Sequence, residues 1–494
     1  MFCPQVVTSC PALSWNALSS VVQPYGYFLF GFAEDAIVLS EQQLEAHTYI
    51  VGDSNSGKTS RVIAPLLEQL ITARKTVWVV DCKADPMLLG HLRAAASAAG
   101  RPFHFFSLQP GVPSTCRLDF FEPLRNAKRT PAQIAEVLLG SLALHQAREP
   151  FFVTQNSSAL RAAIATAMGK GRLSFKSIAH ELRGLIANSR YEHAGHALDT
   201  IEGLAACPEL NDSKLPVLEL ETLLRDGSVC YFCLPVSTES KVTAATTASL
   251  LLKLTTLLSK DLAIRKQPCQ RIYFAIDEFQ DVAGTADLKD LMAQVRGVGS
   301  GISLILAHQV AQQVSDEGMR ALLDSAGVLV FLRPRACARK LQEWSGEKTE
   351  YLATYSRSYS SSSNGSSTTR GVTYTPRVVP ALDMNDIQWV SGAEGFAIAV
   401  IGGRRPFILF FPHHVDYAVA RQRAESAFAL PPPKAPRAAL RPTAAPKMPK
   451  VQKAVPKPQA QPVQKPKVVR QGIADRLAVL AAKLRQSTLY RRQP

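Results

Sequence analysis

The sequence predicts an α/β protein built around a buried, mostly parallel β-sheet. Short apolar runs alternate with helical stretches along most of the chain. A Gly-rich phosphate-binding pattern follows one of these runs directly, and a pair of acidic residues ends another. Continuous apolar runs are typical of parallel strands that helices cover on both faces. These observations together predict a sheet that binds a phosphorylated ligand at the ends of its strands.

The strand-like runs are rich in aromatic and β-branched residues and are separated by turns or helical segments. They cover residues 27–32, 36–39, 48–51, 76–80, 103–107, 229–234, 272–276, 302–306, 328–332, 396–401 and 407–411. Their order and apolar character predict a RecA-like P-loop NTPase fold with a mostly parallel twisted sheet.

The segment after the run Tyr49-Ile50-Val51 matches the pattern GxxxxGK[ST] and carries the strongest functional signal. Its residues, all predicted to bind the nucleotide, are Gly52, Asp53, Ser54, Asn55, Ser56, Gly57, Lys58 and Thr59. A Gly-rich turn at a helix N-terminus presents backbone N–H groups to phosphates. We expect Lys58 to reach the β and γ phosphates and the Thr59 hydroxyl to hold Mg²⁺. The pattern therefore predicts ATP and Mg²⁺ as cofactors.

The second half of the site is expected more than two hundred residues downstream. The apolar run 272–276 ends in Asp277 and Glu278. At such a strand end an Asp can hold Mg²⁺, and the adjacent Glu can act as general base toward water. A further run, 302–306, leads to Gln309, which we expect to contact the γ phosphate or water, unless it is only a polar strand end.

Between residues 125 and 215 no strand is predicted, and helices are expected at 132–144, 158–168, 175–187 and 194–206. An all-helical domain inserted into the sheet domain explains this pattern. The predicted organisation comprises an N-terminal segment (1–24), a nucleotide-binding domain (25–124 and 216–430), the insertion (125–215), a Pro/Lys-rich linker (431–470) and a short amphipathic basic helix (471–494). The Ser-rich residues 357–370 predict a flexible loop or the tip of a long hairpin.

The net charge of +16 is concentrated at the C-terminal end of the chain. From Lys434 onward fifteen Lys or Arg residues face a single acid, Asp475, whereas the remainder has 41 basic and 39 acidic residues. The segment 431–469 contains eleven prolines and predicts a disordered, extended tether. Attraction to nucleic-acid phosphates, or to another acidic partner, is thus expected mainly of the tail.

The nine cysteines have no regular spacing and predict a reduced, cytoplasmic protein rather than a disulfide framework. The first charged residue is Glu34, and prolines interrupt the segment before it. This segment resembles neither a signal peptide nor a membrane span. We expect a cytoplasmic protein that reaches the inner face of the cell membrane, if at all, through partners.

The motifs occur in the order found in the type IV coupling proteins of conjugative transfer, the TraD/TraG type of DNA-transport ATPase. The resemblance covers about residues 25–415. The segments that carry it are 45–48 before the phosphate loop, 64–67 after it, the run 79–85, Phe121-Glu122-Pro123-Leu124, and Ile276-Asp277-Glu278-Phe279. Two N-terminal membrane helices that are typical of the family have no counterpart in the sequence. Cys82, Asp85 and His308 also differ from the residues usual at those positions.

The resemblance implies a homo-hexamer with ATP sites between subunits that moves relaxase-bound single-stranded DNA toward secretion-channel proteins. It also implies that Arg296 acts in a neighbouring subunit's site to stabilise transition-state charge. Asp81 and Lys83 lie at the end of a strand, near the nucleotide by topology, although they could instead cap the loop. Two alternatives remain open: a DNA pump of the FtsK/HerA kind, and a nucleotide-gated relaxase adaptor that does not hydrolyse ATP.

Overall fold

A computed structural model describes residue 23 and residues 26–33, 36–142, 150–188, 191–211, 214–236, 241–283, 301–309, 324–363, 365–403 and 405–413. Arg296, the Pro/Lys-rich linker and the terminal amphipathic helix lie outside the described residues, as does nearly all of the N-terminal segment. The predictions about them are therefore not addressed by the structure.

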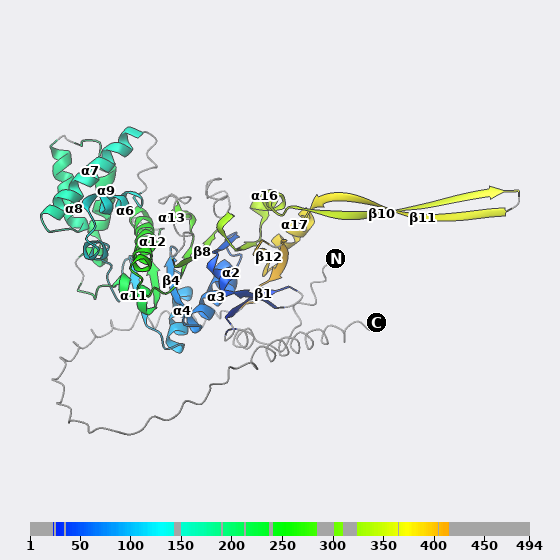
Figure 1. Cartoon of the computed structure of the whole chain (residues 1–494), viewed down its shortest axis with the longest axis horizontal. Helices are drawn as coiled ribbons and strands as arrows, with labels where there is room; N and C mark the ends of the chain where they lie inside the picture. The colour runs from blue at the N-terminus through cyan, green and yellow to red at the C-terminus, as the bar shows by residue number, and fades with distance from the viewer. Residues whose placement is uncertain are drawn as a thin grey trace, which may run out of the picture. The chain divides into compact units, whose positions relative to one another are not determined.

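An eleven-stranded mixed sheet forms the centre of the fold (Figure 1). Its strands are β1 (Tyr27–Phe32), β2 (Ala36–Ser40), β3 (Thr48–Gly52), β4 (Thr76–Asp81), β5 (Phe103–Ser107), β6 (Val229–Cys233), β7 (Ile272–Asp277), β8 (Ile302–His308), β9 (Val328–Leu332), β12 (Phe396–Ile401) and β13 (Phe407–Phe410). The order is β2-β1-β13-β12-β9-β3-β8-β7-β4-β6-β5. Every pairing from β9 to β5 is parallel, and the pairings from β2 to β9 are antiparallel.

The helices of the sheet region are α2 (Glu41–Glu45), α3 (Ala64–Thr72), α4 (Pro86–Ala98), α11 (Leu220–Asp226), α12 (Lys241–Ile264), α13 (Gln280–Ala283), α16 (Ala338–Trp344) and α17 (Met384–Gly392). Alternate strand residues enter two separate cores. Val77 and Val79 of β4 pack in the core that contains α3 and α4, whereas Trp78 and Val80 pack in the core that contains α12. Helices thus cover both faces of the sheet, as the apolar strands predicted.

The middle of the chain is helical. It contains α5 (Glu122–Asn126), α6 (Pro131–Leu139), α7 (Pro150–Gly169), α8 (Phe175–Ala187), α9 (Gly195–Ala206) and α10 (Pro208–Asn211). Helices α6 to α9 pack successively against one another and gather in one cluster in Figure 1. Helix α12 contacts α6 and α9 and so joins this cluster to the sheet. Among the described residues between β5 and β6, the only β pairing is an isolated bridge from Arg117 to Val217.

Helix α12 is the one helix in the described part of the chain that is long and apolar enough to cross a membrane. In the fold, 83% of its most apolar window is buried. Leu251, Leu254 and Leu258 lie in the core shared by the sheet and the helical cluster. Its apolar sequence is therefore accounted for by packing inside the protein.

The Ser-rich segment forms the end of a long antiparallel hairpin. Its strands are β10 (Glu347–Ser362) and β11 (Gly365–Pro380), paired along their whole length. The sequence indicated only the tip, and the stem was not predicted. Every residue from Tyr351 to Ser360 is exposed, so no burial pattern marks these strands. In Figure 1 the two strands run side by side as a ribbon.

Candidate nucleotide site

The phosphate loop follows β3, whose neighbours in the sheet are β8 and β9. Two residues, Asn55 (φ 62°) and Gly57 (φ 90°), have left-handed backbone conformations. Alternation of conformations in such a turn directs successive N–H groups inward, which forms an anion-binding nest. A Cβ at Gly52 would lie 2.7 Å from Ser56 Oγ and 2.8 Å from Leu332 O. Only glycine therefore fits where β3 enters the loop.

The helix after the loop begins with a wide π-helical turn, η2 (Lys58–Ile63), and continues as α3. Pro65 lies at the start of the α-helical part. A proline in a continuous α-helix lacks an N–H and collides with the carbonyl four residues earlier. At the change from π to α geometry the preceding residue, Ala64, instead donates its N–H to Thr59 O, five residues back. This geometry explains how Pro65 is tolerated in this helix.

Lys58 and Thr59 lie at the first turn of this helix. The Lys58 ammonium is buried and donates to Gly52 O at 2.6 Å and to Asp53 O at 3.3 Å. Burial, and then the nearby charge of Lys83, lower its pKa from 10.5 to about 8. The Ser56 hydroxyl is also buried, and it has no partner among the described residues. A phosphate could accept hydrogen bonds from both groups.

The predicted magnesium ligands meet in space although 218 positions separate them. Thr59 Oγ1 donates to Asp277 Oδ2 at 2.8 Å. A hydroxyl and a carboxylate are oxygen ligands that suit Mg²⁺, which usually keeps several waters and binds phosphate oxygens. No cluster of three or more His, Cys, Asp or Glu that could hold a metal occurs in the described ranges. Thr59 and Asp277 would thus hold Mg²⁺ together with phosphate and water rather than within a protein cage.

Glu278 follows Asp277 in a left-handed conformation (φ 60°), which is uncommon for a residue other than glycine. Its side chain is buried and forms an ion pair with Lys83, and Gln280 Nε2 donates to its Oε2 at 2.5 Å. The Phe279 N–H donates to Ala307 O at 2.7 Å, which ties this turn to β8. The proposed general base is therefore held from several directions beside the Mg²⁺ ligands.

Gln309 and Asp81 occupy the neighbouring strand ends. Gln309 Oε1 accepts a hydrogen bond from Ser54 Oγ at 3.0 Å and so reaches the phosphate loop. Asp81 pairs with Asp277 in the β4–β7 register but points to its own loop. Its oxygens accept from Lys83 N, Asp85 N and Tyr231 Oη at 2.9, 2.6 and 2.6 Å. These contacts favour loop capping by Asp81, and its binding to nucleotide stays a prediction.

The environment of Asp81 differs sharply from that of an ordinary carboxylate. Burial raises its pKa to about 6, against the lowering effect of the Tyr231 hydrogen bond. Lys83, from the same loop, turns its side chain to Glu278 rather than to Asp81. Of the two residues predicted from this strand end, Lys83 thus contacts the proposed catalytic group directly.

Three buried polar contacts around the loop were not predicted. Arg61 donates to Phe411 O at 2.8 Å and forms an ion pair with Glu394. Tyr49 hydrogen-bonds to His308 between β3 and β8. The third is the Tyr231 contact to Asp81. The contacts of Arg61 could have been suspected from the sequence, because a charged residue stands there beside the apolar pair Val62-Ile63. The contacts of Tyr49 and Tyr231 have no such signal in the sequence, because their partners lie on distant strands.

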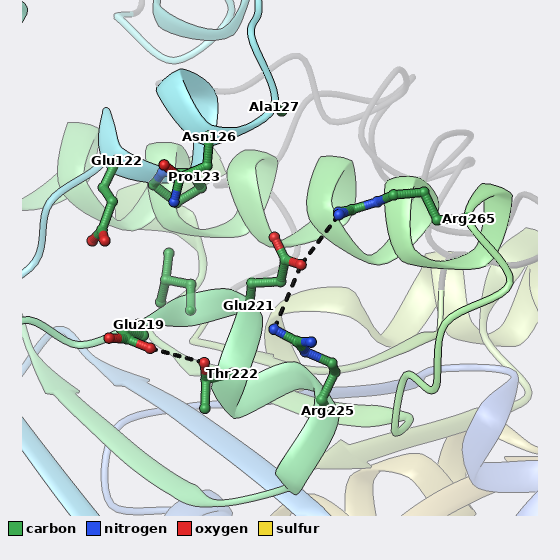
Figure 2. Close-up of a pocket in the computed structure, with 10 residues that line it drawn as sticks. Glu122, Pro123, Asn126, Ala127, Glu219, Glu221, Thr222, Arg225 and Arg265 are labelled. Carbon is green, nitrogen blue, oxygen red and sulfur yellow. Dashed lines mark hydrogen bonds and ion pairs between the residues drawn. The ribbon is translucent and has the colours of Figure 1, made fainter. Parts of the chain in front are cut away.

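A separate polar cavity of about 250 Å³ lies among α5, α11 and α12 (Figure 2). Glu221 pairs there with Arg225 and Arg265, at 3.7 and 3.3 Å. Burial and the nearby Asp119 and Glu219 raise the pKa of Glu122 on the facing wall. None of the residues predicted to bind nucleotide lines this cavity. The ion pairs among the residues that line this cavity account for most of the charged groups in it.

Comparisons with known proteins concern one segment of the sequence and the fold. Residues 271–388 match the family model TraG-D_C, described as the TraM recognition site of TraD and TraG. No curated protein sequence matches the chain.

The fold resembles the conjugative coupling protein TrwBdeltaN70 in an unbound form, with a TM-score of 0.58 and 15% identity, over 80% of this chain and 91% of that one. TrwB in complex with ADP and Mg²⁺ is similar, with a TM-score of 0.55 and 15% identity over 80% of this chain and 92% of that one. VirB4 of Thermoanaerobacter pseudethanolicus has a TM-score of 0.50 and 11% identity over 78% and 96% of the two chains. Residues 271–388 are thus similar to a segment of TraD and TraG, and the chain has the RecA-like P-loop fold seen in the conjugative coupling protein TrwB.

Proposed function

We propose that the chain is an ATP-driven DNA translocase that couples relaxase-bound single-stranded DNA to a type IV secretion channel. The contact from Thr59 Oγ1 to Asp277 Oδ2 supports this proposal most directly, because it joins the two halves of a Mg²⁺–ATP site. TrwB, which shares the fold, has been solved with an ATP analogue and with ADP and Mg²⁺. The similarity of residues 271–388 to the TraM recognition site of TraD and TraG also supports it.

The roles of the residues follow from their positions. The loop N–H groups and Lys58 bind the β and γ phosphates, and Thr59 and Asp277 hold Mg²⁺. When bound, the metal neutralises charge that develops on the transferred phosphoryl group. Glu278 accepts a proton from the attacking water, and Gln309 orients that water or the γ phosphate.

The proposed assembly is a homo-hexamer in the cytoplasm that meets the membrane through its secretion-channel partners. Arg296 then completes the site of a neighbouring subunit, and the helical insertion at 125–215 faces the substrate. The domain boundaries and the role of Arg296 rest on the sequence and its resemblance to the family. Both belong to this proposal.

ATP turnover with and without single-stranded DNA, in the native chain and in Lys58→Ala, tests the proposal. We expect turnover to rise with DNA and to fall on the order of 10²–10³-fold in the variant, as when one transition-state donor is removed. Lys75→Ala is the matched control, since Lys75 lies at the opposite ends of the strands and pairs with Glu41. Its turnover should stay close to that of the native chain.

Two results would replace this proposal. Stimulation by duplex rather than single-stranded DNA, without relaxase binding, would indicate a pump of the FtsK/HerA kind. Negligible turnover in the native chain, with relaxase recruitment unchanged in Glu278→Gln, would indicate a nucleotide-gated adaptor.

A further inference from the structure

The two faces of the β10–β11 hairpin differ in chemistry. Residues directly opposite in an antiparallel pair point to the same face. Register therefore places Tyr351, Tyr355 and Tyr359 on one face together with Tyr374, which lies opposite Ala353. The other face carries mainly Ser and Thr, including the pairs Thr354–Thr373 and Ser358–Thr369. All four tyrosines of the hairpin thus share one side, here called the tyrosine face.

The tyrosine face is open to solvent. Tyr351, Tyr355, Tyr359 and Tyr374 are 68%, 79%, 68% and 65% exposed. Monomeric soluble proteins rarely leave a row of large side chains uncovered, and such rows mark binding sites. Core packing therefore does not explain these residues.

The charges on the same face indicate what binds there. Arg357 lies directly opposite Arg370, between the levels of Tyr355 and Tyr359. Like charges directly opposite in a strand pair destabilise it. No carboxylate in the described chain forms an ion pair with either arginine, and the sequence contains no Asp or Glu from Tyr351 to Leu382. A bound polyanion would relieve this repulsion.

The spacing of the rings suits an unstacked polynucleotide. Strand residues rise about 3.4 Å each, so Tyr351, Tyr374 and Tyr355 occupy successive levels roughly 7 Å apart. The row from Tyr351 to Tyr359 extends roughly 27 Å. Proteins bind single strands by combining aromatic platforms for bases with cationic groups for phosphates. A duplex hides the faces of its bases and cannot use such a platform.

We propose that the tyrosine face of the β10–β11 hairpin is a binding surface for single-stranded DNA, in which Tyr351, Tyr374, Tyr355 and Tyr359 stack on bases and Arg357 and Arg370 bind phosphates. This inference deepens the proposed function, on which it rests for the identity of the substrate. It assigns DNA contacts to a part of the chain separate from both the nucleotide site and the basic tail.

Binding of a fluorescein-labelled oligothymidylate to the full chain, measured by anisotropy without nucleotide, tests the inference. We expect Tyr355→Ala/Tyr359→Ala to raise Kd at least tenfold, since each base–aromatic stack contributes substantially to affinity. Tyr355→Phe/Tyr359→Phe should retain native affinity because the ring remains. Thr354→Ala/Ser358→Ala, on the opposite face of the same strand, is the matched control and should also bind normally.

The arginines and the location of binding are tested separately. Arg357→Gln/Arg370→Gln should reduce the log–log salt slope by about 1.4, which corresponds to two single-strand phosphates. Ultraviolet irradiation of the complex with an oligothymidylate that carries 5-iodouracil should cross-link the DNA to residues within 347–380. This result is expected whether or not the basic tail also binds DNA.

Equal affinity in all tyrosine variants, with cross-links only outside the hairpin, would overturn the inference and favour a protein partner for this face. ATP turnover without DNA is measured in the same variants and should not change, because the hairpin contributes no residue to the nucleotide site. Absence of ATP turnover in the native chain would reject the proposed enzyme. The DNA-binding test would still decide the inference about the hairpin, because it is made without nucleotide.

Discussion

The nucleotide site buries its polar side chains, whereas the β10–β11 hairpin exposes them to solvent. Around the phosphate loop, Lys58, Asp277 and Glu278 are all buried, and each contacts specific partners. On the hairpin, Tyr355 and Arg357 are exposed and lie within a two-stranded ribbon. A buried polar group that loses its partner is costly, whereas an exposed one returns to water. Substitutions at the nucleotide site should therefore change activity or stability strongly, whereas substitutions on the hairpin should change the free energy of unfolding little.

The largest effect is expected at Glu278. Glu278→Gln keeps the size of the side chain but removes the carboxylate that we propose as the general base, so ATP turnover should fall on the order of 10²–10⁴-fold. ATP binding, measured with a fluorescent analogue, should remain near the native affinity because Glu278 is not a predicted phosphate ligand. Native turnover in this variant would mean that another group activates the water.

The next effect concerns the stability of the loop. Arg61→Ala leaves Phe411 O without the guanidinium donor, so the free energy of unfolding should fall by about 1–3 kcal/mol in urea titration. Glu394→Gln is the control. Glu394 is 68% exposed, so the change should be much smaller there. Equal losses in both variants would show that the ion pair, rather than the buried carbonyl, is what Arg61 stabilises.

A pH dependence follows from Lys58. Its pKa of about 8 in the free site rises when phosphates surround the ammonium, so binding takes up a proton at higher pH. ATP affinity should be nearly constant below about pH 7 and weaken above pH 8 by up to about tenfold per unit. Isothermal titration in buffers of different ionisation enthalpy would measure the proton uptake. Affinity that stays constant to pH 9.5 would contradict the assignment.

The smallest effect is expected on the folding of the hairpin region. Tyr355→Ala removes an exposed ring, so the free energy of unfolding should change by less than about 0.5 kcal/mol. Urea titration of this variant beside Arg61→Ala compares the two regions directly. A loss as large as that of Arg61→Ala would show that the tyrosine face packs against another part of the protein.

The sheet was largely predictable because its strands are buried on both faces. The runs at 27–32, 103–107 and 328–332 match β1, β5 and β9 residue for residue. Strands β10 and β11 were missed because they pack against no core. Their Ser, Thr and Tyr residues follow no burial pattern, so only the turn chemistry near Gly365 was visible in the sequence.

The candidate site divides in the same way. Lys58 and Thr59 belong to a local motif, in which we propose that the backbone of the Gly-rich turn binds phosphate, so the sequence was sufficient to predict their roles. Asp277 was assigned from its place at a strand end. The pairing of Lys83 with Glu278 depends on the order β7-β4 in the sheet, which no local pattern specifies.

The sequence by itself determined the phosphate loop, the strands of the sheet and the acidic pair, because each depends on neighbours in the chain and on burial that leaves an apolar pattern. Tertiary structure alone decided that Lys83 meets Glu278, that Asp81 turns to its own loop, and that four tyrosines share one face of a ribbon. Strand order and register set these contacts, and both arise from packing between segments that are far apart in the chain.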